Sequence, residues 1–169
     1  TSSGNKLSEI ALPDGIVIAG VGWNDQEQLI VVEEYGSSRI YDIWGRKLKE
    51  FVVGDGSNVP LHECHFWGNG VVGMGFDLNL YVAEGYAANS NISNTSSVPL
   101  SSTSDGNSSS SSDIRNYKMP TGVNPDRGYT SMAIVPPALS RSAMLEVIVG
   151  TTDKAILVVD ERKVDQVME

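Results

Sequence analysis

The sequence has one cysteine, no run of basic residues and no long apolar segment, and each absence excludes a class of protein. Cys64 cannot form an internal disulfide, so we expect a fold that does not need an oxidising compartment and a cytosolic location. A formal charge of −9 without clusters of lysine or arginine argues against nucleic acid and anionic lipid as partners. The longest apolar runs, such as 16–21, are too short to cross a bilayer, and we expect no direct membrane insertion.

Sequence motifs for common enzymatic chemistry are also missing. No nucleophile elbow, phosphate-binding loop or dinucleotide fingerprint occurs in the chain. The glycines of 68–70 and 73–75 are not followed by a helical pattern, so they are typical of strand turns. We therefore expect no cofactor and no enzymatic activity.

What the chain does have is a repeat of about forty residues, a period typical of four-stranded propeller blades. The segment 40–42 (Ile-Tyr-Asp) is echoed by 82–84 and 158–160, and Trp23 is echoed by Trp67. Apolar residues make up 40% of the sequence, which is enough for a real core. The pattern predicts an all-β, WD-repeat-like β-propeller.

Alternating apolar segments separated by turn residues divide the chain into about three blades, at approximately 16–53, 59–119 and 129–169. Closed propellers have about four to eight blades, so residues 1–169 are expected to form part of one larger propeller domain. The expected strands are 16–23, 29–32, 39–43 and 48–53 in the first blade; 61–67, 70–75, 78–84 and 114–119 in the second; and 129–135, 145–150, 155–160 and 164–168 in the third.

A serine-rich segment interrupts the second blade. Residues 87–113 contain almost no large apolar side chain, and such a composition cannot offset the entropy of ordering by burial. We expect a disordered insertion, with the fourth strand delayed to 114–119. The last segment, 164–168, is open to two interpretations, a fourth strand or a terminal helical turn.

Several stretches resemble the N-terminal domain of the vacuolar protein sorting-associated protein 16 family. The most specific of them is 63–72 (Glu-Cys-His-Phe-Trp-Gly-Asn-Gly-Val-Val). The others are 22–25, 29–33, 39–45, 80–82 and 133–137. The serine-rich insertion has no expected counterpart in the family core.

This resemblance implies a β-propeller at the head of a long α-solenoid, within the HOPS and CORVET tethering complexes. It implies a peripheral location on the cytosolic face of late endosomes, lysosomes or vacuoles. The expected function is that of a non-enzymatic scaffold supporting vesicle fusion and endosomal protein transport. Its partners would be other tethering subunits and, through the complex, small GTPases or fusion factors; the resemblance assigns the Sec1/Munc18-like subunit to the solenoid.

Three residues form a candidate interaction surface: Trp44, Arg46 and Lys47. Trp44 follows the third strand in a turn, where an exposed aromatic side chain would anchor an interface. The alternative is that Trp44 packs against the next blade, because tryptophan is highly buried on average.

Residues 62–65 (His-Glu-Cys-His) place four metal-binding side chains in sequence. On a strand, however, successive side chains point to opposite faces. We expect His62 with Cys64 on one face and Glu63 with His65 on the other, and therefore no metal site.

Acidic residues at turns leave an enzyme alternative open. Paired carboxylates could serve a propeller glycoside hydrolase, whose activity would be lost when Asp42 or Asp77 becomes Asn. The candidate acids are Asp25, Asp42, Asp77, Asp153 and Asp160. Against this, an acid recurs at the end of each third strand (Asp42, Glu84, Asp160), as expected for a repeated structural position. Such an acid can stabilise the following turn by hydrogen bonds to the backbone. A WD-like adaptor outside membrane traffic is the remaining alternative.

Overall fold

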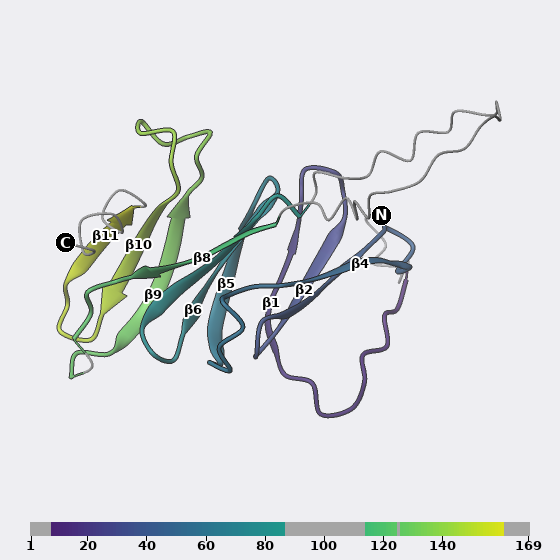
Figure 1. Ribbon diagram of the computed structural model, residues 1–169, viewed down its shortest axis with the longest axis horizontal. Coiled ribbons are helices and arrows are strands. Elements are labelled where there is room, and N and C mark those ends of the chain that lie inside the picture. The colour runs from purple at the N-terminus through teal and green to yellow at the C-terminus, as the bar shows by residue number, and fades with distance from the viewer. Residues whose placement is uncertain (1–7, 87–113, 125, 161–169) are drawn as a thin grey trace, which may run out of the picture.

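The structure is a computed structural model that describes residues 8–86, 114–124 and 126–160. In these ranges the chain forms eleven β-strands and no helix (Figure 1). The strands are β1 (Ile18–Trp23), β2 (Leu29–Glu33), β3 (Ser37–Tyr41), β4 (Lys47–Val52), β5 (Leu61–Trp67), β6 (Gly70–Gly75), β7 (Asn79–Glu84), β8 (Arg115–Pro120), β9 (Tyr129–Val135), β10 (Glu146–Thr151) and β11 (Ile156–Asp160).

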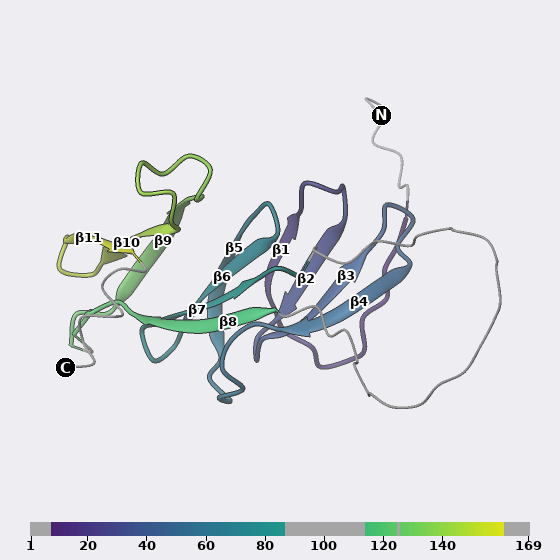
Figure 2. The ribbon, with the colours of Figure 1, turned by 45° about the horizontal axis from the view of Figure 1, so that its top comes forward.

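The strands form three antiparallel sheets in which each strand pairs with its neighbours in sequence. The first sheet contains β1 to β4, the second β5 to β8 and the third β9 to β11. The sheets stand side by side, and their first strands adjoin, since β1 contacts β5 and β5 contacts β9 (Figure 2). This confirms the expected all-β fold of propeller-like blades.

The second sheet is buried on both faces because its side chains alternate between two interfaces. Val71 and Tyr81 pack toward the first sheet, in a cluster with Ile30. Their neighbours Val72 and Val82 pack toward the third sheet. All six residues of β6 are consequently buried. Strands with apolar residues at consecutive positions are typical of sheets covered on both faces.

The first and second sheets approach closely at their inner strands. Gly20 faces Cys64, and a Cβ atom at position 20 would lie only 2.6 Å from the Cβ of Cys64. A Cβ at Gly22 would overlap the ring of Phe66. These two glycines therefore allow β1 and β5 to pack without a gap, which a side chain at either position would prevent.

We predict that Gly22→Ala destabilises the protein by about 1–3 kcal/mol, because the added methyl group overpacks this contact. Chemical denaturation would measure the change. Asn58→Ala, at an exposed position of the connection between β4 and β5, serves as a control and should change the stability by less than about 0.5 kcal/mol. Equal stability of Gly22→Ala and the natural protein would show that the inner strands are not closely packed.

The observed strands follow the sequence-based expectations with small shifts at their ends. The delayed strand is present as β8, and β9 ends directly before Pro136 as expected. The expected insertion at 87–113 and the expected strand or turn at 164–168 lie outside the described residues.

The proposed equivalence of Trp23 and Trp67 is wrong. Trp67 packs toward the third sheet, whereas Trp23, which is 57% exposed, lies on the face of the first sheet that points away from the second. Trp23 pairs with Leu29 across a five-residue turn, and Trp67 pairs with Gly70 across a two-residue turn. The pairing register makes Phe66, which packs toward the preceding sheet, the structural counterpart of Trp23.

Candidate functional site

One end of the three sheets carries all three tryptophans of the chain. We call it the loop end, and it is formed by the turns at 24–28, 42–46 and 68–69 and the connection at 136–145. Trp23 and Trp67 close β1 and β5 at this end, and Trp44 lies in the turn between β3 and β4. Trp23 and Trp44 are largely exposed, whereas Trp67 is partly buried. Exposed tryptophans are enriched at the centres of protein interfaces.

Asp42 determines the conformation of the turn that presents Trp44. Its Oδ1 accepts hydrogen bonds from the backbone N–H groups of Trp44 and Arg46, both at 2.9 Å. Its Oδ2 accepts one from Nε of Arg46 at 2.6 Å. Desolvation favours the neutral acid, but these hydrogen bonds outweigh it and lower the pKa of Asp42. The acid ending the third strand thus serves a turn, as expected.

The predicted surface residues lie together only in part. Trp44 is 67% exposed, so it is not packed against another of the described sheets. The guanidinium of Arg46 lies 5.2 Å from the centre of the Trp44 ring, within the range of a cation–π contact. Lys47 instead forms an ion pair with Glu50 at 2.9 Å, along β4.

An apolar cavity adjoins this turn. It has a volume of about 480 Å³, and Ile43, which is 48% exposed, lies at its edge with the indole of Trp23. The surface predicted from the sequence did not include Ile43 and Trp23. These two residues become neighbours only when the two turns of the first sheet meet. The cavity is lined by Ser8, Ile10, Trp23, Leu29, Asp42, Ile43 and Gly45.

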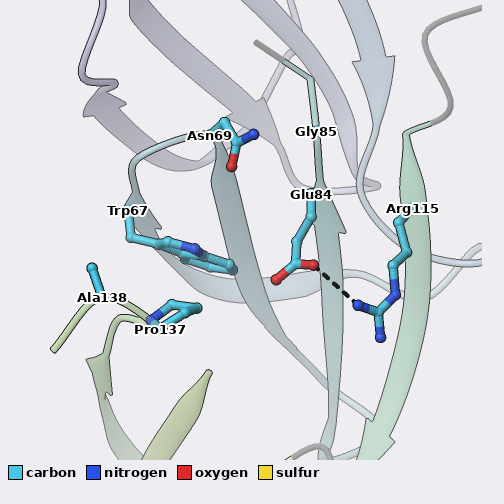
Figure 3. Close-up of a pocket in the computed structure, with 7 residues that line it drawn as sticks. All are labelled: Trp67, Asn69, Glu84, Gly85, Arg115, Pro137 and Ala138. Atoms are coloured by element: carbon cyan, nitrogen blue, oxygen red, sulfur yellow. Dashed lines mark ion pairs between the residues drawn. The ribbon is translucent and has the colours of Figure 1, made fainter. Parts of the chain in front are cut away.

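A second hollow lies at the loop end between the second and third sheets, and we call it the interblade groove (Figure 3). Its volume is about 460 Å³. Trp67 and Pro137 lie together on one side, and Glu84 and Arg115 form an ion pair at 3.5 Å on the other. The groove is lined by Trp67, Asn69, Glu84, Gly85, Arg115, Pro137 and Ala138. Sequence analysis missed it because its walls come from two sheets.

The four metal-binding side chains of residues 62–65 in β5 do not converge. Glu63 and His65 share one face, as expected, with 2.7 Å between Oε1 and Nε2. A β-bulge at His62 breaks the expected pairing with Cys64, and the His62 ring stacks on Phe76 at 3.5 Å. In the described ranges, no three His, Cys, Asp or Glu side chains converge on one point.

Cys64 of this segment and Tyr129 of β9, which packs beside it, are both held by packing. Burial raises the pKa of the Cys64 thiol to about 12, so it stays protonated and unreactive at neutral pH. The hydroxyl oxygen of Tyr129 is buried without a hydrogen bond of normal geometry to any described residue. Burial and the adjacent Glu63 carboxylate raise the pKa of Tyr129. Cys64 is therefore packed at the interface with the first sheet, whereas Tyr129 is packed at the interface between the second and third sheets.

Asp42 and Asp77, the two acids that the enzyme alternative singles out, lie too far apart in the fold to act as a pair. Asp42 belongs to the β3–β4 turn at the loop end, whereas Asp77 belongs to the β6–β7 turn at the opposite end of the second sheet. A glycosidase needs its two carboxyl groups roughly 5–10 Å apart.

Asp77 instead organises a polar cluster at its turn. Its Oδ2 accepts hydrogen bonds from Tyr81 Oη at 2.8 Å, Lys118 Nζ at 3.1 Å and Asn79 Nδ2 at 2.7 Å. Partial burial opposes ionisation, but these hydrogen bonds outweigh it and lower the pKa of Asp77 to about 2. Because Tyr81 belongs to the core and Lys118 to β8, the cluster connects this turn to the fourth strand.

We predict that Asp77→Asn lowers the free energy of unfolding at pH 7 by about 1–2 kcal/mol through the loss of charged hydrogen bonds. Since the folded-state pKa is depressed, the ionised form stabilises the protein above the unfolded pKa of about 3.8, and this stabilisation is lost as the pH falls toward about 2. Thermal unfolding at pH 7 and pH 2.5 should show a difference between variant and natural protein that shrinks in acid. A difference independent of pH would contradict the role given to the carboxylate.

Comparison with known proteins agrees with the fold and with the resemblance found in the sequence. Residues 1–139 match the family model described as Vps16, N-terminal region. The chain belongs to this family. The described residues contain no helix long and apolar enough to cross a membrane.

Two curated relatives align with shorter parts of the chain. A probable vacuolar protein sorting-associated protein 16 homolog of Schizosaccharomyces pombe is 37% identical over 62 residues, which cover 36% of this chain and 7% of that protein. A vacuolar protein sorting-associated protein 16 homolog of Drosophila melanogaster is 33% identical over 58 residues, covering 34% of this chain and 7% of that protein. The alignments therefore span a small fraction of each relative.

Proposed function

We propose that this member of the Vps16 N-terminal family is a non-enzymatic scaffold module in vacuolar protein sorting. The observation that carries the proposal is the family match over residues 1–139. The module would act within a HOPS- or CORVET-type tethering complex on the cytosolic face of endosomes, lysosomes or vacuoles. Its contribution to vesicle fusion would be protein–protein contact, directly with other subunits and indirectly with small GTPases or fusion factors.

The geometry supports binding in place of catalysis. The acids that could have formed a catalytic pair stabilise separate turns, whereas exposed aromatic and basic side chains gather at the loop end. We assign the contact surface to Trp44, Arg46 and Lys47. Tryptophan and arginine are the residue types that most often dominate the energy of protein interfaces.

We predict that the intact protein recovers large vacuolar sorting subunits in native affinity purification. Combining Trp44→Ala with Arg46→Glu and Lys47→Glu should reduce the recovered subunits at least tenfold, equivalent to about 1.4 kcal/mol. Quantitative mass spectrometry of the purified complexes would measure the change.

The matched control is Tyr35→Ala, which removes an aromatic side chain of 53% exposure from the turn between β2 and β3, at the end opposite the loop end. It should leave recovery unchanged. An intact protein that purifies alone would overturn the scaffold function. Normal recovery with the triple variant would overturn only the assignment of the surface.

We also propose that the described sheets are part of one larger propeller domain, in which a further blade covers the outer face of the first sheet. Val21 and Trp23 are 54% and 57% exposed on that face, and Val52 is 48% exposed. The counterpart of Trp23 in the second sheet, Phe66, packs on the glycines of the preceding inner strand. By the same rule, Trp23 would pack on the inner strand of another blade.

We predict that Val21→Asp destabilises the intact natural protein by more than about 2 kcal/mol, because it would bury a charge between two blades. Leu139→Asp is the control, since Leu139 is 77% exposed on the β9–β10 connection. Melting temperatures of the two variants would be compared. If both variants melt like the natural protein, the outer face of the first sheet is not covered by a blade.

A further inference from the structure

The connection between β9 and β10, residues 136–145, projects from the loop end of the third sheet (Figure 1, Figure 2). It is folded on itself by backbone hydrogen bonds. The N–H of Ser140 donates to the carbonyl of Pro136 at 3.0 Å, and the N–H of Ala143 donates to the carbonyl of Ser140 at 3.2 Å. Within residues 136–145 only the side chain of Leu145 is buried. The closed shape of the connection therefore depends on hydrogen bonds more than on core packing.

One carboxylate oxygen holds two serine side chains of this connection. Oε1 of Glu146, the first residue of β10, accepts a hydrogen bond from Oγ of Ser140 at 2.5 Å and one from Oγ of Ser142 at 3.0 Å. The two hydroxyl oxygens lie 2.7 Å apart, and Oγ of Ser140 also accepts a hydrogen bond from the backbone N–H of Ser142 at 3.1 Å. We call Ser140, Ser142 and Glu146 the serine latch. Its hydrogen bonds to a carboxylate belong to the stronger class.

The closed connection also contains an unfavourable backbone conformation. Ala143 has a φ of +54°, in the left-handed region that residues with a Cβ atom adopt only at a cost. Because Ala143 directly follows Ser142, the serine latch holds this conformation in place from the neighbouring residue. Loss of the latch would allow the backbone at Ala143 to relax and the connection to open.

We propose that Ser142 is a phosphorylation site and that its phosphorylation opens the β9–β10 connection. Ser142 lies between two exposed residues, Arg141 and Ala143, which a kinase can contact, and its hydroxyl is held by the longer of the two hydrogen bonds to Glu146. A serine/threonine kinase transfers the γ-phosphoryl group of ATP to Oγ. A phosphorus–Oγ bond forms, the bond from phosphorus to the bridging oxygen breaks to release ADP, and the hydroxyl proton passes to a base of the kinase.

A phosphate group at this position is incompatible with the closed latch. The modified side chain no longer has a hydroxyl proton to donate to Glu146, and it adds about −1.5 to −2 charge at pH 7. This charge is attached to an oxygen only 3.0 Å from the Glu146 carboxylate, so like-charge repulsion separates the serine from β10. Pro137 and Ala138 of the same connection line the interblade groove, and opening therefore displaces one wall of that groove. The device is separate from the contact surface at Trp44.

The test compares the intact protein carrying phosphoserine at position 142 with the unmodified protein, by hydrogen–deuterium exchange of residues 136–145. The amides of Ser140, Ser142 and Ala143 are hydrogen-bonded in the closed connection. After correction with free peptides of the same sequence and modification, their exchange should be faster by about tenfold or more in the phosphorylated protein. Ala138→Asp is the matched control, since it adds a negative charge at an exposed position of the same connection outside the latch, and it should leave the exchange unchanged.

Two further variants separate the added charge from the lost hydroxyl. Ser142→Ala removes the hydroxyl without adding charge and should accelerate exchange less than phosphorylation does. Glu146→Gln replaces the repelling carboxylate with an amide that can donate to the phosphate, so it should reduce the effect of phosphorylation by about threefold or more. Circular dichroism would verify that each protein is folded.

Three results would each overturn the proposal. The first is unchanged exchange in the phosphorylated protein, and the second is equal acceleration by Ala138→Asp. The third is the absence of phosphate on Ser142 in protein isolated from its own cells with phosphatase inhibitors, as measured by mass spectrometry.

Discussion

Burial of one sheet against the next is the interaction on which the rest of this structure depends. A single small antiparallel sheet cannot shield both of its faces, and the second sheet solves this by sending Val71 to one neighbour and Val72 to the other. Each buried side chain of this size contributes about 1.5–3 kcal/mol, which is offset by the entropy of ordering the chain. Turns and ladders fix the register, whereas the interfaces supply most of the stabilisation. The close approach of β1 and β5 at Gly20 is a consequence of the same requirement.

Because the faces of the described sheets are used for packing, the exposed aromatic side chains of Trp23 and Trp44 lie at their ends. The tryptophan-bearing loop end contains both the turn of Trp44 and the interblade groove, but the two differ in how they are built. The Trp44 turn is local, since Asp42 and Arg46 shape it through hydrogen bonds within five residues. The groove is tertiary, because Trp67 comes from the second sheet and Pro137 from the third. A change in sheet packing would therefore alter the groove and leave the turn intact.

The sequence predicts the strands well because their signals are local. Apolar alternation, turn glycines and the acid after each third strand place the strands within a few residues, and the same alternation correctly puts Glu63 and His65 on one face. Two expectations were wrong because they depend on register. The bulge at His62 and the unequal turns after Trp23 and Trp67 each move side chains to the opposite face of their sheet from the one expected. A shift of one residue leaves no signal in the local sequence pattern. The groove could not be predicted, since it requires the relative position of two sheets.

The residues of the groove divide into those that also support the fold and those that do not. Trp67 packs at the interface between the second and third sheets and also lines the groove, so substitutions there would change the shape of the groove and the stability together. Arg115 is largely exposed and contributes its charge without core packing. A substitution at position 115 can therefore change the charge of the groove without repacking the sheets, whereas Trp67 is constrained by the core that it helps to form.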